Sequence, residues 1–225
     1  MIEAVIFDFD GTIVDTESVW TGVYTELLRE RGTSLPEEVL QSIIGTNNDA
    51  MDQYLLQTFG DPGVIAELHR EARLRYDRRM EQPVMREGVA DYLRDAKGMG
   101  LKIGLASSST RDWIDAYIWP LGIGQYFEAI VTADDVERIK PHPDLYIEAL
   151  RRLKAEPDRS LAFEDSVNGL IAARSAGMHC VIVPNEATKK MPFRDFTLRL
   201  DSMADMSLED VIRAVARRAE ENEES

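Results

Sequence analysis

The most restrictive feature of the sequence is an apolar run, residues 2–9, with Asp8 near its end and Asp10 directly after it. Apart from Glu3, the run is apolar up to Asp8, which is typical of a strand covered on both faces in a parallel sheet. Asp8 and Asp10 lie two residues apart, so on a strand their side chains point to the same side. The carboxyl ends of such strands face the ligand site of an open α/β sheet. The two acids therefore predict either metal-assisted chemistry, in which a cation offsets their repulsion, or a simple turn closed by Gly11.

Strand and helix patterns alternate along the second part of the chain. Short apolar strands are expected at residues 102–106, 129–131, 160–163 and 180–183, each followed or preceded by a helical pattern. This alternation predicts an α/β fold with a doubly wound parallel sheet. Residues 16–83 show only helical periodicity. We therefore predict an α/β core domain formed by residues 1–15 and 84–225, with an α-helical domain of residues 16–83 inserted after the first strand.

Composition excludes several classes of function. The formal net charge of −15 argues against nucleic-acid binding, which normally requires a basic face. No apolar stretch approaches the ~20 residues of a membrane span, and the N-terminus lacks the pattern of a signal peptide. The single cysteine, Cys180, excludes an internal disulfide and fits a reducing compartment. We therefore expect a cytoplasmic protein and, in the absence of a heptad pattern, a monomer.

Polar side chains also follow three later strands of the predicted sheet. Ser107 and Ser108 begin a run of hydroxyl residues after the second strand that could donate to phosphate oxygens, while Ser109 or Thr110 could simply cap the next helix. Lys140 precedes a proline after the third strand, where it would neutralise negative charge or simply be solvated. Glu164 and Asp165 follow the fourth strand and suit Mg²⁺, or else Asp165 or Ser166 caps the next helix. Each cluster alone is ambiguous, but clusters at four strand ends favour an active site.

The four clusters together resemble the motifs of a known family. Asp8-Phe9-Asp10-Gly11-Thr12, Ser107, Lys140-Pro141 and Glu164-Asp165-Ser166 resemble the four motifs of the haloacid dehalogenase superfamily. The inserted helices resemble its α-helical cap domain, and the chain looks similar to the β-phosphoglucomutase-like branch. The resemblance implies a Rossmann-like core and a cap that closes through hinges near residues 14–16 and 82–87.

The resemblance also implies a role for each motif residue. Asp8 would attack phosphorus and form an aspartyl-phosphate, while Asp10 would protonate the leaving oxygen and later activate water. Ser107 and Lys140 would bind the transferring phosphoryl group, assisted by the backbone around Ser108. Mg²⁺ would be held by the Asp8 carboxylate, the Asp10 backbone carbonyl and Asp165, with Glu164 nearby in support.

The inserted helices bear on the substrate. Sugar-phosphate mutases of this family carry a histidine where this chain has Trp20, and an arginine in the loop that here contains Asn47 and Asn48. Trp20, Asn47 and Asn48 are therefore candidate substrate contacts, although Asn47 or Asn48 could equally cap a helix. We predict a Mg²⁺-dependent phosphatase of small phosphorylated metabolites. The alternatives are a sugar phosphomutase and a catalytically idle binding protein.

Overall fold

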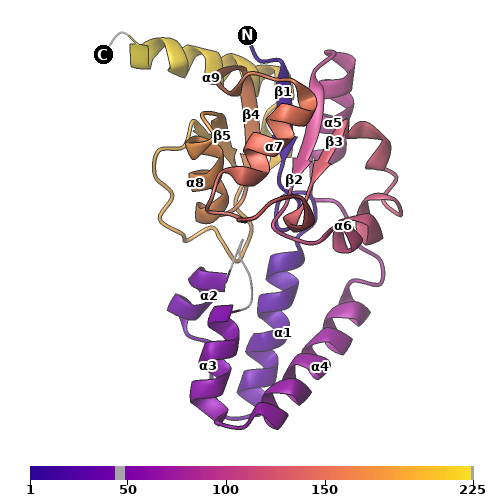
Figure 1. Ribbon diagram of the computed structural model, residues 1–225, viewed down its shortest axis with the longest axis vertical. Coiled ribbons are helices and arrows are strands. Elements are labelled where there is room, and N and C mark those ends of the chain that lie inside the picture. The colour runs from indigo at the N-terminus through magenta and orange to yellow at the C-terminus, as the bar shows by residue number, and fades with distance from the viewer. Residues whose placement is uncertain (44–48, 224–225) are drawn as a thin grey trace.

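A computed structural model describes residues 1–43 and 49–223 of the chain (Figure 1). Its sheet has six strands in the order β3-β2-β1-β4-β5-β6, and every pair of neighbours is parallel. The strands are β1 (Ala4–Phe7), β2 (Lys102–Ala106), β3 (Ala129–Val131), β4 (Ser160–Glu164), β5 (His179–Ile182) and β6 (Leu198–Arg199). The predicted doubly wound sheet is confirmed.

The first strand lies at the centre of the sheet. Phe7, its last residue, pairs with Leu105 of β2 on one side and with Phe163 of β4 on the other. The residues that directly follow β1, β2 and β4 are therefore brought to the same edge of the sheet. The sequence did not predict β6, which has two residues and so lacks the length of apolar pattern by which strands are recognised.

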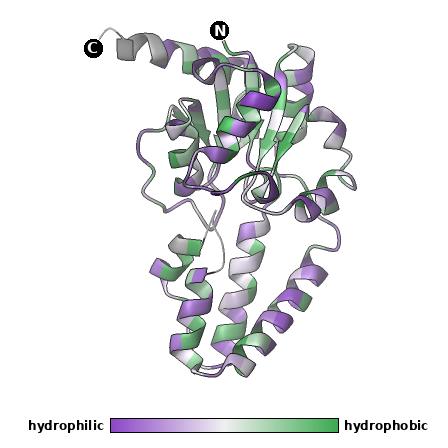
Figure 2. Cartoon of the chain, in the orientation of Figure 1, coloured by the Kyte–Doolittle hydropathy of each residue, from purple (hydrophilic) through white to green (hydrophobic). Residues whose placement is uncertain are grey.

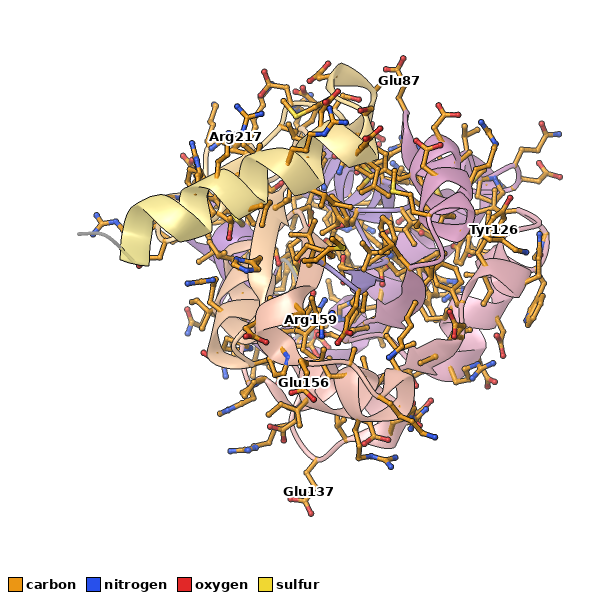
Figure 3. The ribbon with its side chains drawn as sticks, turned by 90° about the horizontal axis from the view of Figure 1, so that it is seen from above. Glu87, Tyr126, Glu137, Glu156, Arg159 and Arg217 are labelled. Carbon is orange, nitrogen blue, oxygen red and sulfur yellow. The ribbon has the colours of Figure 1, made fainter. Side chains whose placement is uncertain are left out.

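Helices cover both faces of the sheet. The first face packs against α5 (Val89–Gly98), α6 (Arg111–Ile118) and α9 (Leu208–Glu223), and the second against α7 (Asp144–Leu153) and α8 (Val167–Ser175). Alternate residues of β1 enter the two cores: Val5 and Phe7 face the first set of helices, and Ala4 and Ile6 face the second. The strands accordingly place apolar residues in both cores, and Figure 2 colours them mostly green. Charged side chains such as Glu137 point outward from the rim (Figure 3).

Four further helices form a separate bundle beyond the carboxyl edge of the sheet (Figure 1). They are α1 (Thr16–Glu30), α2 (Glu37–Ile43), α3 (Asp49–Phe59) and α4 (Pro62–Arg79). Asp15 caps α1 by accepting a hydrogen bond from the Ser18 backbone, and Asp61 with Pro62 begins α4. The bundle has its own apolar cluster: Val23, Tyr24, Leu27, Leu28, Met51, Leu55, Leu68 and Ala72. The residue limits of an inserted domain stay a prediction.

The helices of the described residues are too short or too polar to cross a bilayer, and none of them meets the requirements of a membrane span.

Candidate active site

A buried ionic cluster forms where β1 and β4 end. The Lys140 ammonium donates a hydrogen bond to Asp8 Oδ1, and its Nζ lies 2.7 Å from Glu164 Oε1. It also donates to the Ala106 carbonyl oxygen at 2.9 Å. Asp8, Lys140 and Glu164 are all at most 5% exposed. Because an unpaired buried charge costs several kcal/mol, this contact fixes all three side chains relative to one another.

Asp165 completes a group of three buried carboxylates. One carboxylate oxygen each from Asp8, Glu164 and Asp165 lies within 4.8 Å of the other two. Burial and the neighbouring charges of Asp8 and Glu164 raise the pKa of Asp165 well above its usual value. Burial also raises the pKa of Asp8 to about 7, against the opposing effect of Lys140. Lys140 offsets one of the three charges. When its carboxylates are deprotonated, the group therefore carries excess negative charge on oxygen ligands that suit a Mg²⁺ ion.

The Asp165 carboxylate is hydrogen-bonded by Asn185 and packs against Gly11. Asn185, which follows β5, donates from Nδ2 to Asp165 Oδ2 at 2.7 Å and to the Gly11 carbonyl oxygen at 3.3 Å. A Cβ atom on Gly11 would lie 2.2 Å from Asp165 Oδ2, and Gly11 has a positive φ of 84°. Glycine is therefore required at this turn both for its backbone conformation and for the space that the carboxylate occupies.

The Glu164 carboxylate is enclosed by two helices of the second face. The Tyr146 hydroxyl of α7 donates to Glu164 Oε1 at 2.6 Å. Gly169 of α8 packs directly against the carboxylate: a Cβ atom there would lie 1.9 Å from Glu164 Cδ. Glu164 is the last residue of β4 rather than the first residue after it, and it points into this enclosed space.

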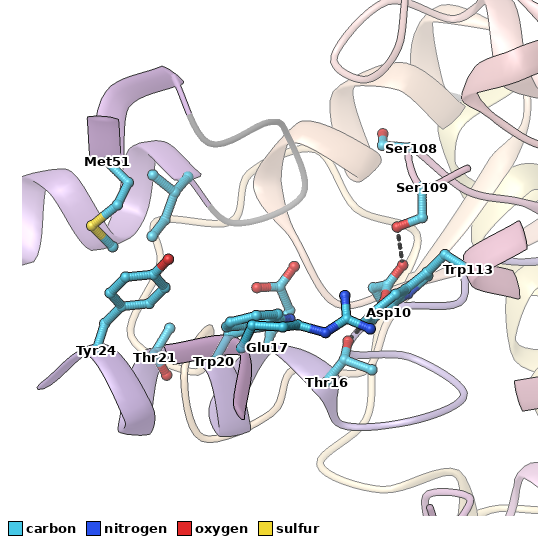
Figure 4. Close-up of a pocket in the computed structure, with 12 residues that line it drawn as sticks. Asp10, Thr16, Glu17, Trp20, Thr21, Tyr24, Met51, Ser108, Ser109 and Trp113 are labelled. Atoms are coloured by element: carbon cyan, nitrogen blue, oxygen red, sulfur yellow. Dashed lines mark hydrogen bonds between the residues drawn. The ribbon is translucent and has the colours of Figure 1, made fainter. Parts of the chain in front are cut away.

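The Asp10 carboxylate lies where the sheet meets the helical bundle. Its Oδ1 accepts hydrogen bonds from Thr16 Oγ1 and Trp113 Nε1, both at 2.8 Å. Its Oδ2 accepts from Ser109 Oγ at 2.6 Å and from Ser107 Oγ at 3.3 Å. Figure 4 shows Ser109 and Trp113 approaching Asp10 from the sheet side and Thr16 approaching from α1. The two acids of the first motif thus have different surroundings and can serve different steps.

A cavity of about 360 Å³ lies between the carboxyl edge of the sheet and the bundle. Asp10, Ser108 and Ser109 line it at the sheet end, and aromatic and polar side chains line it at the bundle end (Figure 4). The other lining residues are Thr16, Glu17, Trp20, Thr21, Tyr24, Ile43, Met51, Arg73 and Trp113. A narrower cavity of about 30 Å³ continues from Asp10 to Asp8 and Asp165. The size suits a small molecule whose one end reaches the carboxylates.

The structure brings most of the predicted site residues together. Asp8, Lys140, Glu164 and Asp165 share the buried cluster, and Ser107 contacts Asp10. Ser108 and Trp20 line the larger cavity. Asn47 and Asn48 lie outside the described residues.

Sequence reasoning did not place Thr16, Trp113, Tyr146 or Asn185 among the residues of the site. It gave Ser109 only as part of the serine run or as a helix cap, whereas the structure places it on Asp10. Asn185 follows a predicted strand, so the rule that found the other clusters would have found it as well. Trp113 and Tyr146 lie inside helices, where the sequence pattern gives no sign that they face a carboxylate.

Comparison with known proteins places this site in a family. Residues 5–183 match the model of the haloacid dehalogenase-like hydrolases. The chain is 48% identical over 209 residues to "Putative phosphatase YhcW" of Bacillus subtilis, covering 92% of this chain and 95% of that protein. The chain therefore belongs to the haloacid dehalogenase-like hydrolase family.

Two solved structures are similar over nearly the whole chain. CbbY from Rhodobacter sphaeroides, in complex with phosphate, has a TM-score of 0.75 and 31% identity, covering 93% of this chain and 98% of that chain. A β-phosphoglucomutase from Clostridium difficile has a TM-score of 0.74 and 25% identity, covering 96% and 98%. The predicted family resemblance is confirmed.

The packing of α8 against the cluster can be tested with Gly169→Ala. Alanine favours a helix by about 1 kcal/mol over glycine, but the new methyl group must displace the Glu164 carboxylate. We expect the variant to be less stable by about 1–3 kcal/mol, the usual cost of overpacking a buried site. Urea unfolding of the wild type and the variant measures the difference.

Gly98→Ala is the matched control, because Gly98 is the last residue of α5 and nothing lies within 4 Å of the position of its Cβ. This variant should be unchanged or up to about 1 kcal/mol more stable. Equal effects of the two substitutions would contradict the close packing of Gly169 on Glu164.

Proposed function

We propose that the protein is a Mg²⁺-dependent phosphatase of small phosphorylated metabolites that works through an aspartyl-phosphate on Asp8. The observation that carries the proposal is the buried contact of Asp8 with Lys140, with the Asp165 carboxylate beside it, at the end of the central strand. A nucleophilic carboxylate needs a nearby cation to approach a phosphoryl group, which is itself anionic. Similarity to YhcW and to CbbY in complex with phosphate supports the same activity.

In the proposed mechanism, an Asp8 carboxylate oxygen attacks phosphorus and the bond from phosphorus to the leaving oxygen breaks. Asp10 gives its proton to the leaving oxygen. The oxygen of a water molecule then attacks the phosphorus of the aspartyl-phosphate while Asp10 takes a proton from that water. The bond from phosphorus to the Asp8 oxygen breaks, which releases inorganic phosphate and restores the Asp8 carboxylate. Lys140 offsets the charge that accumulates on the phosphoryl oxygens, and Ser107 with the backbone of Ser108 orients them.

The three buried carboxylates define where a metal would be held. Asp8 and Asp165 would supply carboxylate oxygens and Asp10 its backbone carbonyl, with Glu164 in support. When bound, Mg²⁺ supplies Lewis-acid stabilisation of phosphoryl charge. It would also offset the burial and the repulsion between carboxylates that together raise the pKa values of Asp8 and Asp165.

Residues 16–83 would act as a cap domain over a core of residues 1–15 and 84–225. The cavity between the bundle and the sheet supports this role, because closure over it would exclude water during phosphoryl transfer. Trp20, Asn47 and Asn48 of the cap would contact the non-reacting part of the substrate. A monomeric state and a cytoplasmic location stay predictions.

The nucleophile is tested with Asp8→Asn, which keeps the shape of the side chain and removes the attacking oxygen anion. We expect phosphate release from a panel of phosphate esters to fall by more than about 1,000-fold, as for the loss of other catalytic nucleophiles. Asp201→Asn, at an exposed aspartate, is the control and should keep wild-type activity. Circular dichroism checks that both variants are folded, and full activity of a folded Asp8→Asn variant would overturn the mechanism.

The metal is tested by chelation and by thermal unfolding. Treatment with EDTA should abolish phosphate release, and added Mg²⁺ should restore it. An ion that binds only the folded state also raises the melting temperature as its concentration increases. We expect this rise in the wild type and its loss in Asp165→Asn, because that substitution removes a proposed ligand. A rise that is unchanged in Asp165→Asn would place the metal elsewhere.

A phosphomutase is the second candidate, favoured by the similarity to β-phosphoglucomutase. A mutase must hold a bisphosphate intermediate by both of its phosphates, and Arg73 is a cation that lines the cavity. Arg73 Nε, however, donates to Asp77 Oδ1 at 2.8 Å, which offsets its charge.

Glucose 1-phosphate distinguishes the two candidates. We expect the protein, primed with glucose 1,6-bisphosphate, to form no glucose 6-phosphate from glucose 1-phosphate, and any turnover to yield inorganic phosphate. Enzymatic assays of both products make the measurement. Faster formation of glucose 6-phosphate than of phosphate would favour the mutase.

A further inference from the structure

The hydrogen bond from Trp113 to Asp10 differs in kind from the other three that Asp10 receives. Thr16, Ser107 and Ser109 contribute hydroxyl groups, which rotate and can either donate or accept. The indole N–H of Trp113 can only donate. The carbonyl oxygen of a carboxylic acid accepts a hydrogen bond better than its hydroxyl oxygen does. The indole N–H on Oδ1 therefore favours Oδ1 as the carbonyl oxygen and Oδ2 as the oxygen that carries a proton.

Oδ2 is the oxygen on the side of the predicted phosphate-binding residues. It contacts Ser109 Oγ and Ser107 Oγ, whose hydroxyl groups can turn to accept when Oδ2 carries the proton. Oδ1 contacts Thr16 of α1 and the Trp113 indole of α6, which approach Asp10 from different elements (Figure 4). The indole thus orients the carboxylate so that its proton-carrying oxygen faces the reacting group.

Contacts from both parts of the molecule fix the Trp113 ring. Tyr117, one turn further along α6, packs at 5.1 Å between ring centroids. From α4 of the bundle, the Tyr76 ring lies 5.6 Å away and the Arg73 guanidinium stands 5.6 Å from the centre of the indole ring. The hydroxyl groups of Tyr76 and Tyr117 are 3.1 Å apart and hydrogen-bonded, which holds the two flanking rings together. A ring packed on these sides has little freedom to turn its N–H away from Asp10.

We propose that Trp113 is a positioning residue for proton transfer: its indole N–H orients the Asp10 carboxylate and directs the transferable proton to Oδ2. This inference rests on the proposed function, in which Asp10 protonates the leaving oxygen. It extends that function to a residue outside the four motifs. It also links the orientation of the carboxylate to α4, since Tyr76 and Arg73 contact the indole.

The test compares Trp113→Phe with the wild type on two probes of similar shape, phenyl phosphate and 4-nitrophenyl phosphate, with Mg²⁺ present. Nitrophenolate is weakly basic and leaves without a proton, whereas phenolate is more basic and depends on the acid. The value of kcat/KM reports steps up to departure of the leaving group. We expect kcat/KM to fall about tenfold further for phenyl phosphate than for 4-nitrophenyl phosphate, as expected for losing one hydrogen bond to a charged group.

Two further variants separate the hydrogen bond from the packing. β-(3-Benzothienyl)alanine at position 113 has the shape of tryptophan without the N–H group. It should therefore shift the ratio of kcat/KM for 4-nitrophenyl phosphate to kcat/KM for phenyl phosphate as Trp113→Phe does, even if Trp113→Phe is destabilised. Trp119→Phe is the control, at the residue that directly follows α6. Trp119 is 54% exposed, and its indole N–H donates to Asp115 Oδ1 rather than to a carboxylate of the site. Its ratio should equal that of the wild type.

The outcomes distinguish this inference from the proposed function. Asp10→Asn should widen the same ratio further than Trp113→Phe, because it removes the acid itself. If Asp10→Asn leaves the ratio unchanged, the proton role of Asp10 is wrong and the proposed mechanism fails with it. If Asp10→Asn widens the ratio but removal of the indole N–H does not, or lowers both kcat/KM values equally, only the role of Trp113 is overturned.

Discussion

The site depends on the buried contact of Lys140 with Asp8 and Glu164. The Lys140 and Asp8 positions are 132 residues apart in the chain, and both side chains are almost completely removed from water. Removing one partner of such a contact leaves a buried charge without compensation, which typically costs about 3–5 kcal/mol. Burial lowers the pKa of Lys140, but the charges of Asp8 and Glu164 outweigh it and raise the pKa overall. The ammonium therefore stays charged, and the cluster keeps its cation in the folded protein.

The order of the strands makes this contact possible. Because Phe7 pairs with Phe163, the next residues of the two strands, Asp8 and Glu164, emerge side by side at the edge of the sheet. Repulsion between them is then unavoidable, and Lys140 relieves it for two of the three carboxylates in the group. Asp165 remains, held by an amide rather than by a cation. Three buried carboxylates with one ammonium group destabilise the folded protein when all three are charged. A divalent cation bound to their oxygen atoms would remove this repulsion.

The same geometry explains which parts of the site the sequence could predict. Asp8, Ser107, Lys140 and Asp165 follow strands or lie in the connections after them, and a parallel sheet brings such positions to one edge whatever the details of packing.

Trp113 and Tyr146 could not be predicted in this way. Both lie within helices, and whether a helical side chain faces a carboxylate or the apolar core depends on how the helix packs. The end of a strand is also difficult to predict to within one residue. Glu164 is the last residue of β4, whereas the sequence predicted that it follows the strand. Its side chain contacts Tyr146 and packs against Gly169.

Asp10 lies at the junction between the sheet and the bundle. The chain passes from the sheet into the bundle at Thr16, the first residue of α1, and Thr16 donates to Asp10. The last helix of the bundle, α4, contacts the same carboxylate indirectly, through Tyr76 and the Trp113 indole. Two donors to Asp10 thus involve the bundle: Thr16 belongs to it, and Trp113 packs against Tyr76 and Arg73 of α4. The surroundings of this carboxylate are therefore built by both parts of the molecule.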